Sequence, residues 1–239
     1  MAEEYLPFPE DFERALAVVA HPDDVEYGGA AAVARWTAQD RSVAYLLVTR
    51  GEAGIDSIPP AECGPLREAE QRAAAAEVGV DVVEFLDHPD GLISYGVPLR
   101  RDITAAIRRH RPEVVITVNH RETWPSGEPN MADHRVVGQA AIDAVRDAAN
   151  RWLFPDAGEP WTGVRRVALM ASPRNTHAVD TTDVFDRGVA SLTAHRVYLA
   201  ALGGAMADPA HFLRGMAEAD AARLPGARLA SAFELLDLT

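Results

Sequence analysis

The apolar residues of the first 150 positions fall into short continuous runs, separated by longer amphipathic or alanine-rich stretches. Continuous apolar runs of this kind are typical of parallel strands that are covered on both faces. They occupy residues 15–20, 42–49, 82–86 and 114–119. The stretches between and after them predict helices at 26–39, 66–78, 98–110 and 132–149. Four rounds of strand and helix therefore predict a Rossmann-like, doubly wound and mainly parallel α/β sheet.

The pattern becomes weaker after Pro155, where shorter elements are predicted. They are short strands at 166–170 and 178–181, an amphipathic helix at 184–202, a helix at 209–222 and an edge strand at 231–238. Neither an internal repeat nor a linker-like stretch interrupts the chain. We therefore expect one domain over residues 1–239, with a core at about 14–150 and a smaller C-terminal α+β extension at about 151–239.

Composition and charge narrow the class of protein. The 239 residues carry a net charge of −13, which argues against a nucleic acid or an anionic membrane as partner. Cys63 is the only cysteine, so any metal must be bound by His, Asp or Glu side chains. The acidic N-terminus lacks the pattern of a signal peptide, and no stretch approaches a membrane-spanning length, so we expect a cytoplasmic protein. A homo-oligomer is compatible with the sequence.

Residues that can carry chemistry gather directly after the first apolar run, in Ala20-His21-Pro22-Asp23-Asp24-Val25-Glu26. In α/β sheets, ligands bind outside the carboxyl ends of the strands. Taken alone, a histidine beside acidic residues in a turn is more often a hydrogen-bonding cap. However, His21 and Asp24 follow the first strand and His134 follows the fourth. Two histidines and one carboxylate make a metal-binding set that leaves coordination positions open for catalysis.

Three further motifs follow that loop in order: Thr49-Arg-Gly-Glu-Ala-Gly54, Arg67-x-x-Glu70 and Asp133-His134-Arg-x-Val-Gly138. Together the motifs resemble the LmbE/PIG-L family of metal-dependent N-acetylglucosamine deacetylases. The resemblance spans roughly residues 14 to 202, and its first motif is the most specific.

The resemblance implies an LmbE-like fold in which His21, Asp24 and His134 hold one divalent metal ion, with zinc the first expectation and ferrous iron the alternative. It also implies that Asp23 faces the bound water as general base. The expected reaction is removal of an acyl group, in the first place acetyl, from an N-acyl amino sugar or glycoconjugate. Two alternatives remain open: an amidase that acts on a thiol conjugate or natural product, and a catalytically silent sugar-binding protein.

The last motif departs from the family pattern at Met131, where many members carry a histidine that acts as the acid. A thioether has no proton to donate. We therefore expect Asp23 to carry the proton to the departing amine, with help from His177 or His120. Asp133 is expected to orient a histidine.

Four residues are candidates for substrate binding: Arg67, Glu70, Asp90 and Trp124. Arg67 could also form an ion pair on a helix surface, although the family resemblance favours a substrate clamp. Asp90 could line the pocket or belong to an ordinary turn. Trp124 is either a wall that faces a sugar ring or a packing residue.

Overall fold

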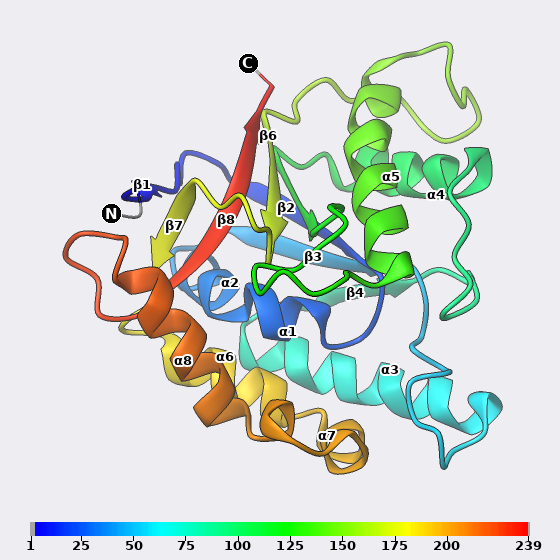
Figure 1. Cartoon of the computed structure of the whole chain (residues 1–239). Helices are drawn as coiled ribbons and strands as arrows, with labels where there is room; N and C mark the ends of the chain where they lie inside the picture. The colour runs from blue at the N-terminus through cyan, green and yellow to red at the C-terminus, as the bar shows by residue number, and fades with distance from the viewer. Residues whose placement is uncertain (1–2, 239) are drawn as a thin grey trace.

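The computed structural model describes residues 3–238, and within them eight strands form one sheet in the order β1-β7-β8-β6-β5-β2-β3-β4 (Figure 1). The strands are β1 (Leu6–Pro7), β2 (Arg14–Val19), β3 (Ser42–Leu47), β4 (Val82–Phe85), β5 (Val114–Val118), β6 (Arg166–Met170), β7 (His177–Asp180) and β8 (Ala230–Asp237). Neighbouring strands are parallel, except that β8 runs antiparallel to both β6 and β7. The predicted mainly parallel α/β sheet is confirmed.

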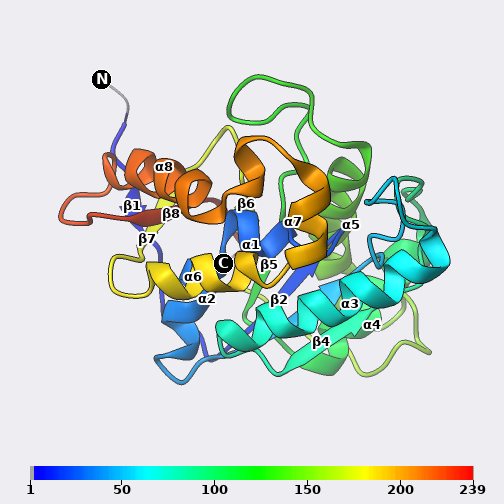
Figure 2. The ribbon, with the colours of Figure 1, turned by 90° about the horizontal axis from the view of Figure 1, so that it is seen from below.

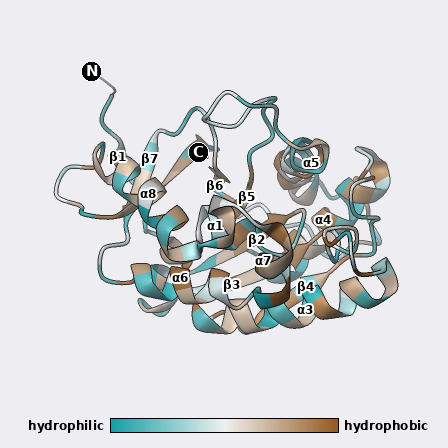
Figure 3. Ribbon diagram, turned by 60° about the horizontal axis from the view of Figure 1, so that its bottom comes forward, coloured by the Kyte–Doolittle hydropathy of each residue, from teal (hydrophilic) through white to brown (hydrophobic). Residues whose placement is uncertain are grey.

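Helices cover both faces of the sheet. They are α1 (Asp24–Gly28), α2 (Ala30–Thr37), α3 (Pro60–Glu77), α4 (Val97–His110), α5 (Ala132–Ala149), α6 (Phe185–Thr193), α7 (Arg196–Leu202) and α8 (Pro209–Ala221), with a 3-10 turn η1 (Ala205–Ala207). The pair α4 and α5 packs over β2 and β5, while α1, α2 and α6 lie on the opposite side (Figures 1 and 2). Hydrophobic colours run along the central strands in Figure 3, whereas the helices carry both colours. No described helix is long and apolar enough to cross a membrane.

The order of the strands determines where a site can form. From β2 the chain proceeds to β3 and β4 on one side, and it then returns to β5 and β6 on the other side. The connections after β2 and β5 therefore run in opposite directions, and this switch point is where doubly wound sheets bind ligands. Strand β2 is completely buried from Leu16 to Val19, so the loop that follows it starts from a rigid position.

Two predicted helices are each two helices in the structure. The stretch 26–39 is divided into α1 and α2 at Gly29, and 184–202 is divided into α6 and α7 at Ala194 and His195. Another helix begins earlier than predicted, because α3 starts at Pro60. Proline is well tolerated in the first turn of a helix, where the missing N–H has no acceptor. The predicted loop 50–65 is therefore shorter than expected.

The predicted edge strand at 231–238 is wrong in its position. As β8, this segment lies between β6 and β7, and the edges of the described sheet are β1 and β4. The central position of β8 leaves its one ionisable inward residue in need of partners. In the folded chain Glu234 is buried and accepts hydrogen bonds from Arg121 and from the hydroxyl of Ser172.

Helix α5 lies directly against the end of β5 at Gly138. A Cβ atom at this position would lie 2.5 Å from the carbonyl oxygen of Val118 and 2.9 Å from the Cβ of His120. His134 is one turn earlier on the same helix, so this close approach also determines the height of His134 above the sheet.

We predict that Gly138→Ala lowers the free energy of unfolding by about 1–3 kcal/mol, because the added methyl group meets backbone that cannot yield. Gly215→Ala in α8 is the matched control, since nothing lies within 4 Å of its added Cβ. The control should gain about 0.5–1 kcal/mol from better helix propensity. Urea unfolding of both variants measures the difference, and a Gly138→Ala protein as stable as wild type would contradict this packing.

A second prediction concerns pH and stability. Asp220 in α8 accepts a hydrogen bond from the Ala232 N–H at 3.1 Å, and burial raises the pKa of its carboxyl from 3.8 to about 6, against the opposing effect of Arg223. Because the folded pKa is the higher one, the ionised carboxylate destabilises the fold above pH 6, and this penalty disappears as the pH falls toward 4. We expect Asp220→Asn, which keeps the acceptor, to raise the free energy of unfolding by about 1–2 kcal/mol at pH 7.5 and to change little at pH 4. Thermal unfolding at both pH values tests this, and an equal gain at both would contradict it.

Candidate metal centre

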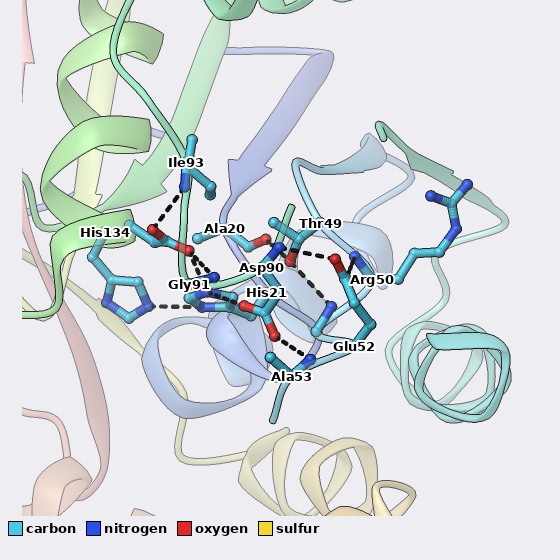
Figure 4. Close-up of polar contacts among 12 residues, drawn as sticks. Ala20, His21, Thr49, Arg50, Glu52, Ala53, Asp90, Gly91, Ile93 and His134 are labelled. Atoms are coloured by element: carbon cyan, nitrogen blue, oxygen red, sulfur yellow. Dashed lines mark hydrogen bonds and ion pairs between the residues drawn. The ribbon is translucent and has the colours of Figure 1, made fainter. Parts of the chain in front are cut away.

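Three buried side chains converge at the switch point of the sheet. His21 follows β2, Asp24 is the first residue of α1, and His134 lies in the first turn of α5. The Nδ1 atom of His21 lies 3.2 Å from Nε2 of His134, and Oδ1 of Asp24 lies 3.0 Å from the same Nε2 and 3.7 Å from Nδ1 of His21. Figure 4 shows the two imidazoles facing each other.

This spacing fits a metal ion. Ligand atoms that lie 2.0–2.1 Å from a tetrahedral ion are about 3.3 Å from one another. The three donor atoms lie within one ligand sphere, so His21, Asp24 and His134 could hold one ion. Burial opposes the ionisation of Asp24, but the imidazoles of His134 and His21 outweigh it and hold the pKa of Asp24 well below its usual range. The carboxylate is therefore present in the charged form that binds a cation.

The surrounding hydrogen bonds orient both ligands. The second oxygen of Asp24 accepts from the N–H groups of Ala20 at 2.9 Å and His21 at 2.8 Å. The Nε2 atom of His21 lies 3.1 Å from Oδ1 of Asp90 and 3.3 Å from Oδ2 of Asp133. A proton on Nε2 satisfies these carboxylates and leaves Nδ1 free as a ligand. His21, Asp90 and Asp133 also have metal-like spacing, and this hydrogen bond accounts for it.

Asp133 therefore orients the His21 ring, as the sequence predicted. Main-chain N–H groups in turn fix the position of the Asp133 carboxylate. Its carboxylate accepts from the N–H groups of Gly91 at 2.8 Å and Ile93 at 3.2 Å (Figure 4). Burial opposes the charge on His21, but hydrogen bonds with Asp133, Asp24 and Asp90 raise the pKa of His21 well above its usual value. The carboxylates around His21 thus favour positive charge at this position.

Asp23 is next to the donor set but faces other partners. It adopts a left-handed backbone conformation, with φ of 91°, which aspartate tolerates better than most residues. Its N–H donates to Oε1 of Gln71 at 2.9 Å, and its Oδ2 lies 3.4 Å from Nη2 of Arg67. Burial raises the pKa of Asp23 to about 6, against Arg67, which lowers it, while Asp24 raises it further. A carboxylate of this pKa is suited to act as general base near neutral pH.

Arg67 and Glu70, both predicted to bind substrate, make hydrogen bonds within the fold. Arg67 is 2% exposed, and its guanidinium donates to the carbonyl oxygens of Pro22 at 2.6 Å and Gly51 at 3.1 Å. It is not a surface ion pair, because it is buried and both of its terminal nitrogens donate to the turns around it. Glu70 accepts from the Val197 N–H at 2.6 Å and so caps α7. These internal contacts give both residues a role in the fold, and their contact with substrate stays a prediction.

The other two substrate candidates lie beside the donor set. Both oxygens of Asp90 are occupied, one by His21 and one by the Ala53 N–H at 2.9 Å, so Asp90 orients His21 and joins two loops. These two bonds leave further acceptor positions on the carboxylate, and a contact of Asp90 with substrate stays a prediction. Trp124 is half-buried, and its ring makes a T-shaped contact with the His134 imidazole, with centroids 5.3 Å apart and ring planes at 87°. The structure thus places an aromatic ring beside the cluster, while its contact with substrate stays a prediction.

The two candidate acids differ in their position. His177 in β7 is separated from β2 by β8, β6 and β5, which at about 4.8 Å per strand is about 19 Å. The prediction for His177 is therefore wrong, because β8 inserts between β6 and β7. His120 follows β5 and packs against Gly138. Burial and the nearby Arg121 lower the pKa of His120 below 6.5, so its imidazole is neutral at pH 7.

Two neighbours of Asp23 were missed from the sequence. Gln71 follows Arg67 by one helical turn, so the i, i+4 spacing on α3 was a signal that could have revealed it. Tyr198 lies on α7 with its ring over Arg67, and no local pattern indicates this contact.

Known proteins share both sequence and fold with this chain. A diacetylchitobiose deacetylase of Thermococcus kodakarensis is 27% identical over 191 residues, which cover 77% of this chain and 70% of that protein. A 1D-myo-inositol 2-acetamido-2-deoxy-alpha-D-glucopyranoside deacetylase of Streptomyces avermitilis is 31% identical over 176 residues, covering 62% of this chain and 58% of that protein. The matched part of the chain thus spans between 58% and 70% of these relatives.

Solved structures confirm the fold. The N,N'-diacetylchitobiose deacetylase of Pyrococcus horikoshii aligns with a TM-score of 0.83 at 23% identity, over 95% of this chain and 85% of that chain. GalB, the 4-carboxy-2-hydroxymuconate hydratase of Pseudomonas putida, aligns with a TM-score of 0.74 at 19% identity, over 95% and 96%. At these identities the likeness concerns the fold alone.

The match to a protein family is more specific. Residues 16–145 match the family model PIG-L, described as GlcNAc-PI de-N-acetylase. The matched segment contains all four motifs and the complete donor set, and it confirms the resemblance seen in the sequence. The chain therefore belongs to the PIG-L family of GlcNAc-PI de-N-acetylases.

Proposed function

We propose that this protein is a metal-dependent deacetylase that removes the acetyl group from an N-acetylglucosamine-containing small molecule. The observation that carries the proposal is the pairing of the donor set of His21, Asp24 and His134 with the buried carboxylate of Asp23, whose pKa is about 6. A site that only binds a sugar needs no base beside its metal. Two relatives named as deacetylases of acetamido sugars support the substrate class.

We propose zinc as the ion, since two imidazoles and a carboxylate with open positions are typical of catalytic zinc, although ferrous iron accepts the same ligands. A divalent ion held there supplies Lewis acidity, which lowers the pKa of water from about 15.7 toward 7 and polarises the amide carbonyl. The cytoplasmic location and the oligomeric state stay predictions from the sequence.

The side chains divide the remaining chemistry among them. Asp23 takes a proton from the attacking water at its carboxylate and then gives it to the nitrogen of the departing amine. The double role follows from the neighbours, because Met131 has no proton to give and is 53% exposed, and His120 is neutral at pH 7. Asp90 and Asp133 keep the His21 ring in its ligand orientation, and Trp124 forms a wall against which a sugar ring can stack.

The lack of an acid at Met131 favours one alternative, a catalytically silent sugar-binding protein. In that protein the donor set would bind metal and the sugar would remain intact. An amidase that acts on a thiol conjugate or natural product would share the same catalytic residues, and it would differ in the amine that hydrolysis releases. A panel of N-acyl substrates distinguishes it from the sugar deacetylase.

We predict that Asp23→Asn lowers kcat for release of primary amine from N-acetylglucosamine derivatives by about 10²- to 10⁴-fold, because the general base is lost. Its metal content, measured by mass spectrometry, should equal that of wild type. His134→Ala is the comparison variant and should lose the metal. Stoichiometric metal with no turnover of any amide by wild type would favour the binding protein, and absence of metal after reconstitution would refute the donor set.

A pH–rate profile tests the assignment of the acid. Wild-type kcat/KM should fall at acidic pH, because Asp23 must be ionised to act as the base. The midpoint of this fall should lie at or below about pH 6, since a bound cation favours the carboxylate further. We expect His120→Gln to keep both limbs of the profile and kcat within about twofold of wild type. Loss of the basic limb in His120→Gln would show instead that His120 delivers the proton.

A further inference from the structure

The loop between β5 and α5 is a small hairpin with a buried base and an exposed tip. In Figure 1 this green segment, residues 119–131, leads into the lower end of α5. Asn119 and Asn130 are buried near its two ends, whereas residues 125–129 are exposed. A loop of this length in a compact domain is usually either functional or disordered. The hydrogen bonds of residues 119–131 identify an ordered loop.

Main-chain bonds give the tip of the hairpin a fixed shape. The Trp124 N–H donates to the Glu128 carbonyl at 2.9 Å. The Gly127 N–H donates to the Trp124 carbonyl at 2.9 Å, which closes a turn with Pro125 at its second position. Proline favours that position, because its φ is already restricted to the value that the turn requires. The backbone of Trp124 is therefore held through both its N–H and its carbonyl group.

One side chain, Asn130, closes the base of the hairpin. Its Nδ2 group donates to the carbonyl oxygens of Asn119 at 2.7 Å and Arg121 at 2.9 Å. Its Oδ1 atom accepts from the Met131 N–H at 2.8 Å, and its main-chain N–H donates to the Glu122 carbonyl at 2.8 Å. Asn130 is 5% exposed, so its loss would take a donor away from two carbonyl groups inside the protein.

The same hairpin brings Trp124 to the donor set. Met131 is the residue before α5, and His134 lies in the first turn of that helix. The Trp124 ring makes its T-shaped contact with the His134 imidazole. Trp124 is half-buried, so part of its ring stays accessible beside the donor set. Asn130 thus joins the loop that carries an aromatic ring to the helix that carries a predicted metal ligand.

We propose that Asn130 is a positioning residue for substrate binding: its amide holds the hairpin closed and thereby keeps Trp124 in place as a preformed wall for a sugar ring. This inference rests on the function proposed above. A wall that exists before the ligand arrives avoids the free energy that ordering a loop would cost on binding. Because the ring contributes equally to ground-state and transition-state binding, its displacement should raise KM and leave kcat unchanged.

The test is a double-mutant cycle on the metal-loaded enzyme, with Trp124→Ala, Asn130→Ala and the double variant. We expect each single variant to raise KM for an N-acetylglucosamine derivative about three- to tenfold, with kcat within about twofold of wild type. The double variant should have the KM of Trp124→Ala, because Asn130 acts only through that ring. Asn130→Asp keeps the acceptor toward Met131 but has no N–H for the two carbonyls, so it should behave like Asn130→Ala.

Asn150→Ala is the matched control. Asn150 follows α5 at its opposite end, and its Oδ1 accepts from the N–H of another loop tryptophan, Trp152, at 2.9 Å. The 18 residues of α5 separate Asn150 from Asn130 by about 27 Å along the helix. This variant should therefore keep the KM and kcat of wild type.

Hydrogen exchange of the main-chain N–H groups gives a readout that does not need activity. Peptides that cover residues 119–131 should exchange about tenfold faster in Asn130→Ala than in wild type, because the bonded N–H groups of Trp124 and Gly127 open with the hairpin. Equal exchange in the two proteins would overturn the proposal. Additive effects on KM in the cycle, or a fall in kcat with KM kept, would also overturn it.

The proposed function and the role of Asn130 can fail separately. Failure of wild type to hydrolyse any N-acyl sugar would reject the proposed function. The affinities of the same variants for the N-acetylglucosamine derivative, measured by calorimetry, would then decide the role of Asn130 through the same cycle. A wild-type protein that neither hydrolyses nor binds the sugar would overturn both proposals.

Discussion

The burial of four carboxylates around two imidazoles is the constraint on which this part of the molecule depends. Among the described residues, Asp24, Asp90 and Asp133 contact the imidazoles of His21 and His134, and Asp23 lies buried beside them against Arg67. An isolated buried charge costs several kcal/mol, so each oxygen needs a donor or a cation. The chain supplies main-chain N–H groups from three separate loops, at residues 20–21, at residue 53 and at residues 91–93. A divalent ion at the donor atoms of His21, Asp24 and His134 would offset part of the remaining negative charge.

This constraint explains why the loops that follow β2, β3 and β4 pack against one another. Asp90 receives the Ala53 N–H and gives its own N–H to Glu52, so the two loops are fastened in both directions (Figure 4). Asp133 at the start of α5 receives donors from the loop after β4. Asp90 and Asp133 therefore hold the loops together and also bind His21. The same hydrogen bonds stabilise the loop positions and the buried charges.

Local patterns predicted the parts of the fold that depend on neighbours in sequence. The apolar runs located the parallel strands, and the pairing of His21 with Asp24 could be seen because both follow one strand. His134 comes from a distant helix, and it could be added because it follows the fourth predicted strand, whose carboxyl end lies at the same edge of the sheet. The failures concern long-range order: His177 was misplaced because no local signal shows that β8 inserts between β6 and β7. The burial of Arg67 could not be predicted, because the groups that accept its hydrogen bonds are main-chain carbonyls, which leave no trace in the sequence.

The insertion of β8 also has a consequence for the order of folding during synthesis. Strand β1 is paired with β7, and β7 reaches the rest of the sheet through β8. Strand β1 must therefore wait for β8, which is made much later, before it gains its place in the sheet. In contrast, β2 to β6 can pair without that segment, so the metal-binding loops can assemble on a nascent chain while residues 230–237 are still being made.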